Sequence, residues 1–347
     1  MSVTYVPVGW SRTKLAYDGV LLTGVMIYLL AYLGLAAPLQ PDQSPPDGGS
    51  LPIKAFGSCA LLLLGTVLAI GPLARLDRRF LPLLYNRRHF GVITCTVAAA
   101  HAWHVLGWYF AFAATPPLEG MLTADTSFFQ LRGFPFIPFG IAALTILLAL
   151  AFTSHDFWLN FLGAPLWKRL HMGVYAAYGL AVLHVGLGAL QDSRNPLLAV
   201  VVAGQIAILC GLHVAAGRQA RAEDRAPAAD GDWVDAGPVA GIAEGRGIVV
   251  PLGDGTSVAI FRDRGRLSAI SNLCAHQNGP LGEGRVIDGC VTCPWHGYQY
   301  RLTDGCAPAP FSERLATYRL RLTNGRVWLD RRANPPGTRV EPVEISP

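Results

Sequence analysis

Charged side chains are scarce in this sequence. Only 15% of its 347 residues are Asp, Glu, Lys or Arg, whereas about 25% are charged in a typical soluble protein. Apolar residues make up 52%, and the mean hydropathy is +0.35. One packed core cannot hold so many apolar residues, so we expect them in runs long enough to cross a bilayer. The composition excludes a wholly soluble enzyme.

Cysteines and clustered basic residues are also few. Seven Cys are too scattered for a disulfide scaffold, but four of them follow residue 270 and indicate a metal site there. The net charge is +5, yet no block of Lys and Arg forms the stripe that binds nucleic acid, so we expect no nucleic-acid partner. No G-x-G-x-x-G motif opens a helix after a predicted strand, and we expect no nicotinamide-binding domain.

Six apolar runs predict six transmembrane helices within residues 17–215. Each run has about the 20 residues that a membrane span requires. The runs cover residues 17–37, 56–76, 90–113, 134–153, 169–190 and 196–215. Residues 1–16 precede the first run, which is longer than the apolar part of a typical signal peptide, so we expect a span and not a cleaved leader.

Lys and Arg in the loops predict the orientation of these spans. Twelve of them lie near the ends of the runs on one side, and only Lys54, Arg132 and Arg194 lie in the opposite loops. Basic residues are retained in the cytoplasm, so this asymmetry predicts that both termini are cytoplasmic. We therefore expect a multi-pass protein of the inner (plasma) membrane, surrounded by the lipid bilayer.

The composition changes after the last run. Residues 216–232 are rich in charge, Ala and Gly, which is typical of a linker. Residues 233–331 contain short β-branched stretches separated by Gly and Asp, which predicts a small all-β domain. Residues 332–347 include four Pro and are expected to be disordered. The predicted fold class is a membrane α-helical bundle joined to a small all-β domain.

Two Cys–His pairs stand within the predicted β-domain. They are Cys274-Ala-His276 and Cys293-Pro-Trp-His296. Together with the following Gly-x-x-Tyr300, these motifs closely resemble the Rieske ferredoxin domains over roughly residues 233–330. The resemblance implies a [2Fe–2S] cluster that has both Cys thiolates on one iron and both His imidazoles on the other. The alternative is a Cys₂His₂ zinc site, although such sites usually open with C-x₂₋₄-C.

The cluster motifs depart from the high-potential members of the resembled family. Gly279 and Trp295 occupy the places of two Cys that form a disulfide there, and Tyr298 occupies the place of a Ser that donates to the cluster. Fewer donors imply a potential in the lower part of the roughly −150 to +300 mV range of Rieske centres. Cys290 and Cys306 match no ligand position and are expected to be buried thiols.

Histidines at bilayer depth indicate haem. His101 and His104 lie roughly 20 Å beyond the cytoplasmic Arg88, and His184 lies equally far beyond Arg169, for a rise of 1.5 Å per residue. Two His on facing helices at one level can bind opposite faces of a b-type haem. The spacing predicts an outer haem between His184 and either His101 or His104.

The membrane half also resembles the ferric reductase-like transmembrane domains, and above all the haem-binding membrane subunit of the methionine sulfoxide reductase system. The residues that carry this resemblance are Arg87-Arg88-His89-Phe90-Gly91, His101, Leu162-Gly163, Trp167, Leu170-His171 and His184. It implies that His101, His171 and His184 are associated with haem. A second, inner haem would need His171 with His213 or His89, so one or two haems are expected. His171 and His184 are 13 residues apart, which places them roughly 140° apart on a continuous helix.

These features together predict an integral-membrane electron-transfer oxidoreductase. Electrons would enter from a separate cytoplasmic reductase, pass through the Rieske cluster and b-type haem, and reach a quinone, ferric iron, oxygen or a periplasmic protein. The alternative is a membrane-anchored Rieske ferredoxin or redox sensor that serves a soluble oxygenase, with no electron crossing the bilayer. A helical unit that serves only as an anchor does not need His residues deep in the membrane, where they are costly. Their presence favours electron transfer across the bilayer.

Overall fold

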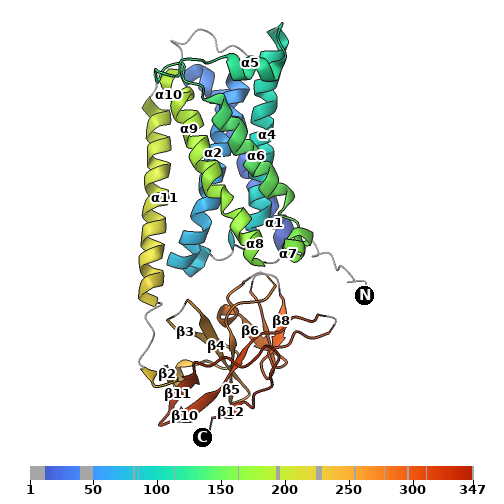
Figure 1. The fold of residues 1–347 in the computed structure, drawn as a ribbon, viewed down its shortest axis with the longest axis vertical. Helices are drawn as coiled ribbons and strands as arrows, with labels where there is room; N and C mark the ends of the chain where they lie inside the picture. Colours follow the sequence, from blue (N-terminus) through green and yellow to red (C-terminus); the bar gives the residue numbers. More distant parts are fainter. Residues whose placement is uncertain are drawn as a thin grey trace. The chain divides into compact units, whose positions relative to one another are not determined.

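The computed structural model describes twelve stretches of the chain. They are residues 12–39, 50–80, 83–84, 86–112, 114–162, 164–192, 196–223, 229–253, 255–276, 278–294, 297–309 and 311–345. The chain divides into two compact units, Met1–Ala216 and Gly217–Pro347. The first unit is helical and the second is built of strands (Figure 1).

Long apolar helices make up the first unit. The helices are α1 (Arg12–Leu39), α2 (Ser50–Leu76), the 3₁₀ turn η1 (Arg78–Phe80), α4 (Arg87–Phe112), α5 (Pro117–Thr123), α6 (Ile137–Phe152), α7 (Asp156–Leu162), α8 (Ala164–His171), α9 (Gly173–Leu187), α10 (Ala189–Asp192) and α11 (Pro196–Glu223). Within the described residues, five stretches are long and apolar enough to span a membrane: those in α1, α2, α4 and α11, and Leu166–Gln191.

The predicted fourth span corresponds to the shorter helix α6. It has 16 residues, or about 24 Å at 1.5 Å per residue, and it starts at Ile137 with Pro138 in its first turn. The helical membrane bundle is confirmed, with five full-length candidate spans and one short apolar helix where six spans were predicted.

The predicted fifth span corresponds to α8 and α9. Helix α8 ends at His171 and α9 begins at Gly173, with Met172 in a turn between them. Met172 keeps helical dihedral angles and its amide donates to the Lys168 carbonyl at 3.0 Å, so Leu166–Gln191 forms one candidate span.

Helix α2 is the centre of the bundle. Its buried residues pack against α1 and α4 on one side and take part in a cluster with α4, α6 and α9 on the other. That second cluster contains Leu64, Cys95, Leu147 and Ala177. These side chains fix α4 and α9 around one core, so residues of the two helices can meet across it.

Polar contacts also join α1 to the start of α4, and α11 to α2. Asp18 of α1 accepts from the buried Asn86 side chain at 2.7 Å and lies 2.7 Å from Nδ1 of His89. Gln205 of α11 donates to the Leu61 and Leu62 carbonyls of α2 at 3.3 Å. Polar groups within a bilayer need such internal partners, because lipid offers none.

The second unit is an all-β fold. Its strands are β1 (Ala229–Asp230), β2 (Trp233–Pro238), β3 (Gly247–Pro251), β4 (Ser257–Asp263), β5 (Arg266–Ser271), β6 (Arg285–Ile287), β7 (Cys290–Thr292), β8 (Gln299–Arg301), β9 (Thr317–Tyr318), β10 (Leu320–Thr323), β11 (Arg326–Asp330) and β12 (Val343–Glu344). They form three antiparallel groups, in the orders β1-β2-β11-β10, β12-β5-β4-β3 with β9 also on β5, and β6-β7-β8. The small all-β domain is therefore confirmed.

Tight turns set the registers of these strands. The pairs Arg264-Gly265, Asp288-Gly289 and Asn324-Gly325 each have positive φ at both positions and connect two paired strands. Two such residues form the type I′ turn, whose twist matches that of a hairpin. Two cores result. One lies between the first two sheets, and the other surrounds Cys274, Cys293 and Tyr300.

The expectation of disorder over 332–347 is wrong for residues 332–345. Strand β12 pairs with β5, Val343 and Ile345 pack against the core of the two sheets, and the Thr317 hydroxyl donates to the Thr338 carbonyl at 2.8 Å. The proline content suggested a tail that packs against nothing, but these apolar side chains complete the core between the first two sheets. Residues 216–232 also differ from a plain linker, since α11 continues to Glu223 and β1 precedes β2.

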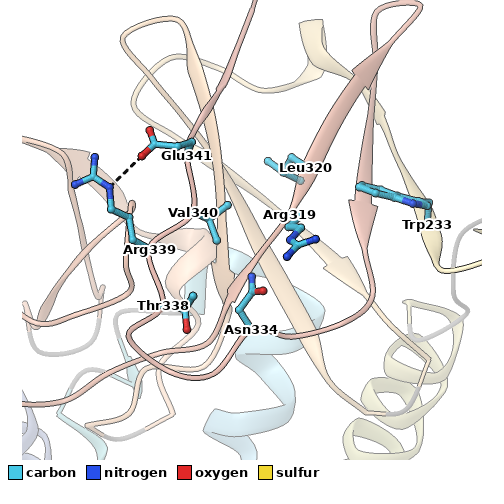
Figure 2. A pocket seen from close by; sticks show the side chains of 8 residues that line it. All are labelled: Trp233, Arg319, Leu320, Asn334, Thr338, Arg339, Val340 and Glu341. Atoms are coloured by element: carbon cyan, nitrogen blue, oxygen red, sulfur yellow. Dashed lines mark hydrogen bonds and ion pairs between the residues drawn. The ribbon is translucent and has the colours of Figure 1, made fainter.

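The returning tail borders a cavity of about 360 Å³. Trp233, Arg319 and Asn334 line it together with the tail residues from Thr338 to Glu341, and Arg339 is paired with Glu341 at 3.1 Å (Figure 2). None of the predicted ligands lines this cavity.

Deletion of residues 333–347 should destabilise the β-domain. Partial burial of Val343 and Ile345 contributes roughly 1 kcal/mol each, and a loss of about 2 kcal/mol lowers the Tm of a domain of this size by roughly 8 °C or more. Circular dichroism of the detergent-solubilised full chain and of the deletion measures the shift. Glu344→Gln, which removes only an exposed ion pair, serves as control and should change little. If the deletion leaves the Tm unchanged, the tail does not stabilise the domain, and the expectation that it is disordered would stand.

Candidate functional site

Two loops of the β-domain carry the predicted cluster ligands. The first follows β5 and contains Cys274 and His276, and the second joins β7 to β8 and begins at Cys293. Both Cys side chains are buried, at 1% and 2% exposure. The predicted fourth ligand, His296, and its neighbour Trp295 lie outside the described residues.

The two loops are closed by the same pair of backbone bonds. The Cys274 amide donates to the Gly279 carbonyl at 2.9 Å, and the Cys293 amide donates to the Tyr298 carbonyl at 2.7 Å, five residues ahead in both cases. Asn278 and Gly297, four residues after each Cys, donate back to the Cys carbonyls and have φ of 60° and 72°. Each loop is thus closed by matching bonds between its Cys and the residues four and five positions later.

Aromatic side chains connect the loops. The His276 ring stacks on Tyr298 of the second loop, with centroids 4.9 Å apart and an angle of 7° between planes. The Tyr300 hydroxyl lies 3.5 Å from Sγ of Cys274. Burial, and then the negative charge of Cys274, raise the pKa of Tyr300 well above its ordinary value, so the phenol stays protonated. It can therefore donate to the Cys274 thiolate.

The described donors of the two loops are two thiols and one imidazole, the ligand types of a Rieske centre. Among the described residues, no three His, Cys, Asp or Glu side chains are grouped closely enough to hold one metal ion. A Rieske centre divides its four ligands between two irons, so each iron takes only two protein side chains. Cys274, Cys293 and His276 could supply three of these ligands.

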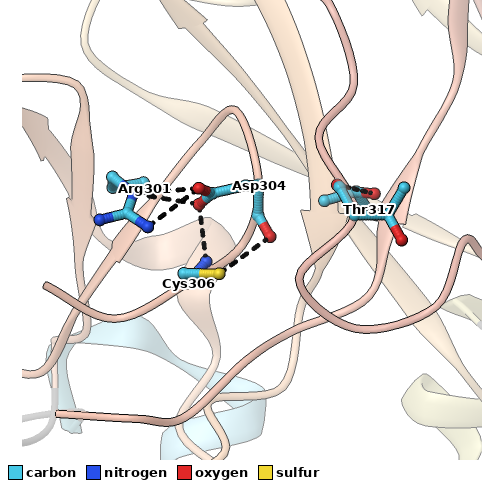
Figure 3. A network of polar contacts seen from close by, with 5 residues as sticks. Arg301, Asp304, Cys306 and Thr317 are labelled. Atoms are coloured by element: carbon cyan, nitrogen blue, oxygen red, sulfur yellow. Dashed lines mark hydrogen bonds and ion pairs between the residues drawn. The ribbon is translucent and has the colours of Figure 1, made fainter.

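The β-domain has two cysteines outside the ligand motifs, Cys290 at the start of strand β7 and Cys306 after strand β8. Cys306 lies in the turn after β8, where Asp304 accepts from the Arg301 side chain and from the Cys306 amide at 2.9 Å (Figure 3). Cys290 pairs with Arg301 in the β7–β8 ladder. Both thiols are partly buried, as neighbours of the strand that carries Tyr300.

In the helical unit, His101 and His184 face each other. Their ring centroids are 6.2 Å apart and their planes are inclined by 78°. Metal–nitrogen bonds are about 2 Å long, so imidazoles that bind one metal from opposite sides have centroids roughly 6 Å apart. The pair formed by α4 and α9 therefore matches the spacing of two axial ligands.

Backbone carbonyls fix the tautomer of both rings. His101 donates from Nδ1 to the Ile53 carbonyl at 2.9 Å, and His184 donates from Nδ1 to the Phe136 carbonyl at 3.0 Å. A carbonyl can only accept, so the proton is on Nδ1 and the lone pair is on Nε2. This is the arrangement that orients a metal-binding His and makes it more basic.

The remaining membrane histidines have other contacts. The His104 ring packs on Phe56 with centroids 5.1 Å apart, so the ring that faces His184 is that of His101. His213 is bonded through Nδ1 to the Leu209 carbonyl and through Nε2 to the Tyr175 hydroxyl. His89 is paired with Asp18.

His171 lies in a stack at the end of α8. Its ring lies 3.8 Å from that of Trp167, its Nε2 is 3.2 Å from the Thr153 hydroxyl, and the Arg88 guanidinium covers Trp167 at 5.0 Å. The pairing of His171 with His213 or His89 at an inner haem stays a prediction. Sequence reasoning did not anticipate the Arg88–Trp167–His171 stack, nor the carbonyls of Ile53 and Phe136.

Both units match known families. Residues 55–182 match the ferric reductase like transmembrane component, and residues 232–319 match the Rieske [2Fe-2S] domain. The chain is 35% identical over 164 residues to the protein-methionine-sulfoxide reductase heme-binding subunit MsrQ of Xanthomonas axonopodis pv. citri, which covers 46% of this chain and 66% of that protein.

A second group of relatives matches the β-domain. The chain is 38% identical over 71 residues to the anthranilate 1,2-dioxygenase ferredoxin subunit of Burkholderia cepacia, covering 20% of this chain and 66% of that protein. Among solved structures, the ferredoxin of Sphingomonas yanoikuyae B1 is 26% identical, covers 28% of this chain and 96% of that chain, and has a TM-score of 0.27. The chain spans 66% of the length of the two curated relatives named here.

Replacement of a cluster ligand should abolish the Rieske electron-spin resonance signal. Cys274→Ser, Cys293→Ser, His276→Ala and His296→Ala each remove one of two protein ligands from an iron. Haem absorbance should persist in all four variants, because the two units fold separately. Cys306→Ser is the matched control and should keep the signal. A retained signal in any of the four variants, or stoichiometric zinc without iron, contradicts the assignment.

Tyr300→Phe should lower the midpoint potential of the cluster. The hydroxyl stabilises the reduced, more negative state more than the oxidised one, and each kcal/mol of that difference corresponds to roughly 40 mV for one electron. Redox titration of the spin resonance signal measures the shift. Tyr318→Phe, in the other core of the domain, is the control. Equal potentials in the wild type and Tyr300→Phe would show that the hydroxyl does not donate to the cluster.

Proposed function

We propose that this chain, which joins a ferric reductase-like transmembrane component to a Rieske [2Fe-2S] domain, is an integral-membrane electron-transfer oxidoreductase that moves electrons across the bilayer. The observation that carries the proposal is the His101–His184 pair, whose 6.2 Å separation and Nδ1 bonds suit two axial ligands of one b-type haem. The relative named as a heme-binding subunit supports the same cofactor.

Cys274 and Cys293 would hold one iron of the cluster, and His276 and His296 would hold the other. When bound, the cluster and the haem supply one-electron redox chemistry. The protein contributes the matching loop closures, the burial of both cysteines and the Tyr300 donor. Burial keeps water from the sulfurs, and each donor to them raises the potential.

In the membrane, His101 and His184 would bind through Nε2 while their Nδ1 protons stay on the Ile53 and Phe136 carbonyls. This bond holds each ring in place when the redox state changes, and it favours the ferric state by making the imidazole more electron-rich. His171 would be associated with an inner haem only if its Nε2 exchanged the Thr153 hydroxyl for the metal. The outer haem is the stronger part of the proposal.

The charge of the loops favours one orientation in the membrane. Basic residues lie at the start of α1, from the end of α2 to the start of α4, in α8 and near the end of α11, which favours a cytoplasmic location for both termini and for the Rieske domain. The electron donor would then be a separate cytoplasmic reductase. The acceptor, on the far side or within the bilayer, would be a quinone, ferric iron, oxygen or a periplasmic protein.

A second function is favoured by one finding, the similarity of the β-domain to the ferredoxin subunit of a dioxygenase. In that case the helical unit would anchor a Rieske ferredoxin or redox sensor, which would serve a soluble oxygenase at the membrane surface. The paired His101 and His184 would then have no redox role.

His184→Ala separates the two functions. It removes an axial ligand, so b-type absorbance should disappear, and cytoplasmic reductant should no longer reduce an impermeant acceptor outside sealed vesicles. The Rieske signal should remain. His101→Ala should behave in the same way, whereas His104→Ala should retain the haem, because the ring of His104 packs on Phe56. Difference spectra and vesicle assays measure both effects.

Two outcomes would contradict the proposal. Full haem and full transmembrane reduction in both His184→Ala and His101→Ala would mean that the path does not use these residues. If the unaltered chain reduces nothing outside the vesicle with any donor, the anchored ferredoxin is the better reading.

A further inference from the structure

The His101 and His184 sites are built in the same way. In each, the ring bonds to a carbonyl that stands 48 residues earlier, near the start of the helix that packs against its own. Ile53 is in the first turn of α2, and Phe136 directly precedes α6. The pairs α2–α4 and α6–α9 therefore present two copies of one local structure.

A glycine stands four residues after each of these carbonyls, one turn further along the helix. These are Gly57 in α2 and Gly140 in α6. A Cβ at Gly57 would lie 2.9 Å from Nδ1 of His101, and a Cβ at Gly140 would lie 2.8 Å from Nδ1 of His184. Both distances are shorter than van der Waals contact, so each imidazole occupies the volume that a side chain would fill.

The glycine and the carbonyl act on the same ring atom. The carbonyl draws Nδ1 toward the helix backbone, and the missing Cβ lets the ring come close enough for a bond of 2.9 to 3.0 Å. A larger residue would push the ring away from the neighbouring helix and break that bond. It would also move Nε2 of that ring relative to Nε2 of the other histidine. The centroids of the two rings are 6.2 Å apart.

We infer that Gly57 and Gly140 are positioning residues for the two axial histidines, and that together with the Ile53 and Phe136 carbonyls they form a duplicated clamp. The inference rests on the proposed function for the identity of the bound group, since it assigns the Nε2 atoms to a haem iron. The clamp itself is steric and is tested separately from the haem.

The test compares four Gly→Ala variants in the full chain. Gly57→Ala and Gly140→Ala place a methyl group against the two rings. Gly65→Ala, also in α2, places a methyl group against the Gln205 side chain instead, and Gly179→Ala, in α9, meets no atom within 4 Å. Gly65→Ala controls for a steric disturbance of the bundle, and Gly179→Ala controls for the substitution itself.

Low-temperature spin resonance of oxidised membranes measures the low-spin haem signal relative to the Rieske signal of the same chain. Gly57→Ala and Gly140→Ala should each lose this low-spin signal by roughly 10-fold or more, the order of effect seen when the partner of a metal-binding His is lost. Pyridine haemochrome spectra report whether the haem is lost or has become high-spin. Both controls should keep the wild-type ratio.

A rescue variant covers the case in which a substitution prevents folding. The double variant Gly57→Ala/His101→Ala removes the ring that the new methyl group meets, so it should accumulate in membranes even if Gly57→Ala does not. Gly140→Ala/His184→Ala should be rescued in the same way. This readout requires no haem.

The outcomes separate the two claims. Wild-type spectra in Gly57→Ala and Gly140→Ala, an equal loss in Gly65→Ala, or a double variant that stays absent would each overturn the clamp. If His184→Ala eliminates the haem while both glycine variants keep wild-type spectra, the clamp alone fails. If the unaltered chain binds no haem, the proposed function fails, and rescue by the double variants still decides the steric claim.

Discussion

A bilayer offers no hydrogen-bond partners, and this constraint decides how the helical unit can present histidine. An imidazole always carries at least one N–H, so a ring at bilayer depth needs an acceptor within the protein. Carbonyls near helix starts supply it for His101 and His184, since they can accept a bond beyond those within the helix. The same bond holds the proton on Nδ1, which leaves Nε2 of each ring as the atom that can bind a metal.

The β-domain solves an analogous problem with loops. Thiolates need burial to exclude water and donors to balance their charge. The five-residue closure after Cys274 and Cys293 gives each loop the same internal bonds, and the Asn278 and Gly297 positions allow the left-handed turn that those bonds require. Both units thus present candidate ligands in pairs, from two similar pieces of backbone, which gives each member of a pair a similar environment.

Several candidate site residues could be named from sequence because their signals are local. The Cys-x-His and Cys-x-x-His motifs have a fixed spacing, and the depth of His101 and His184 follows from counting residues beyond the basic boundary. The order of the C-terminal tail could not be predicted in this way. Its Val343 and Ile345 are apolar residues in a proline-containing segment, and only their partners on β5 and in the core show that they are buried.

Composition and spacing alone determined the membrane bundle, the small β-domain and the candidate ligands, because bilayer length, strand patterning and ligand spacing are properties of short segments. Tertiary structure decided which histidine faces which. His101 and His104 are one turn apart on α4. Only the packing of α2 places the Ile53 carbonyl against His101 and Phe56 against His104. Such choices depend on contacts between residues dozens of positions apart, which no local pattern contains.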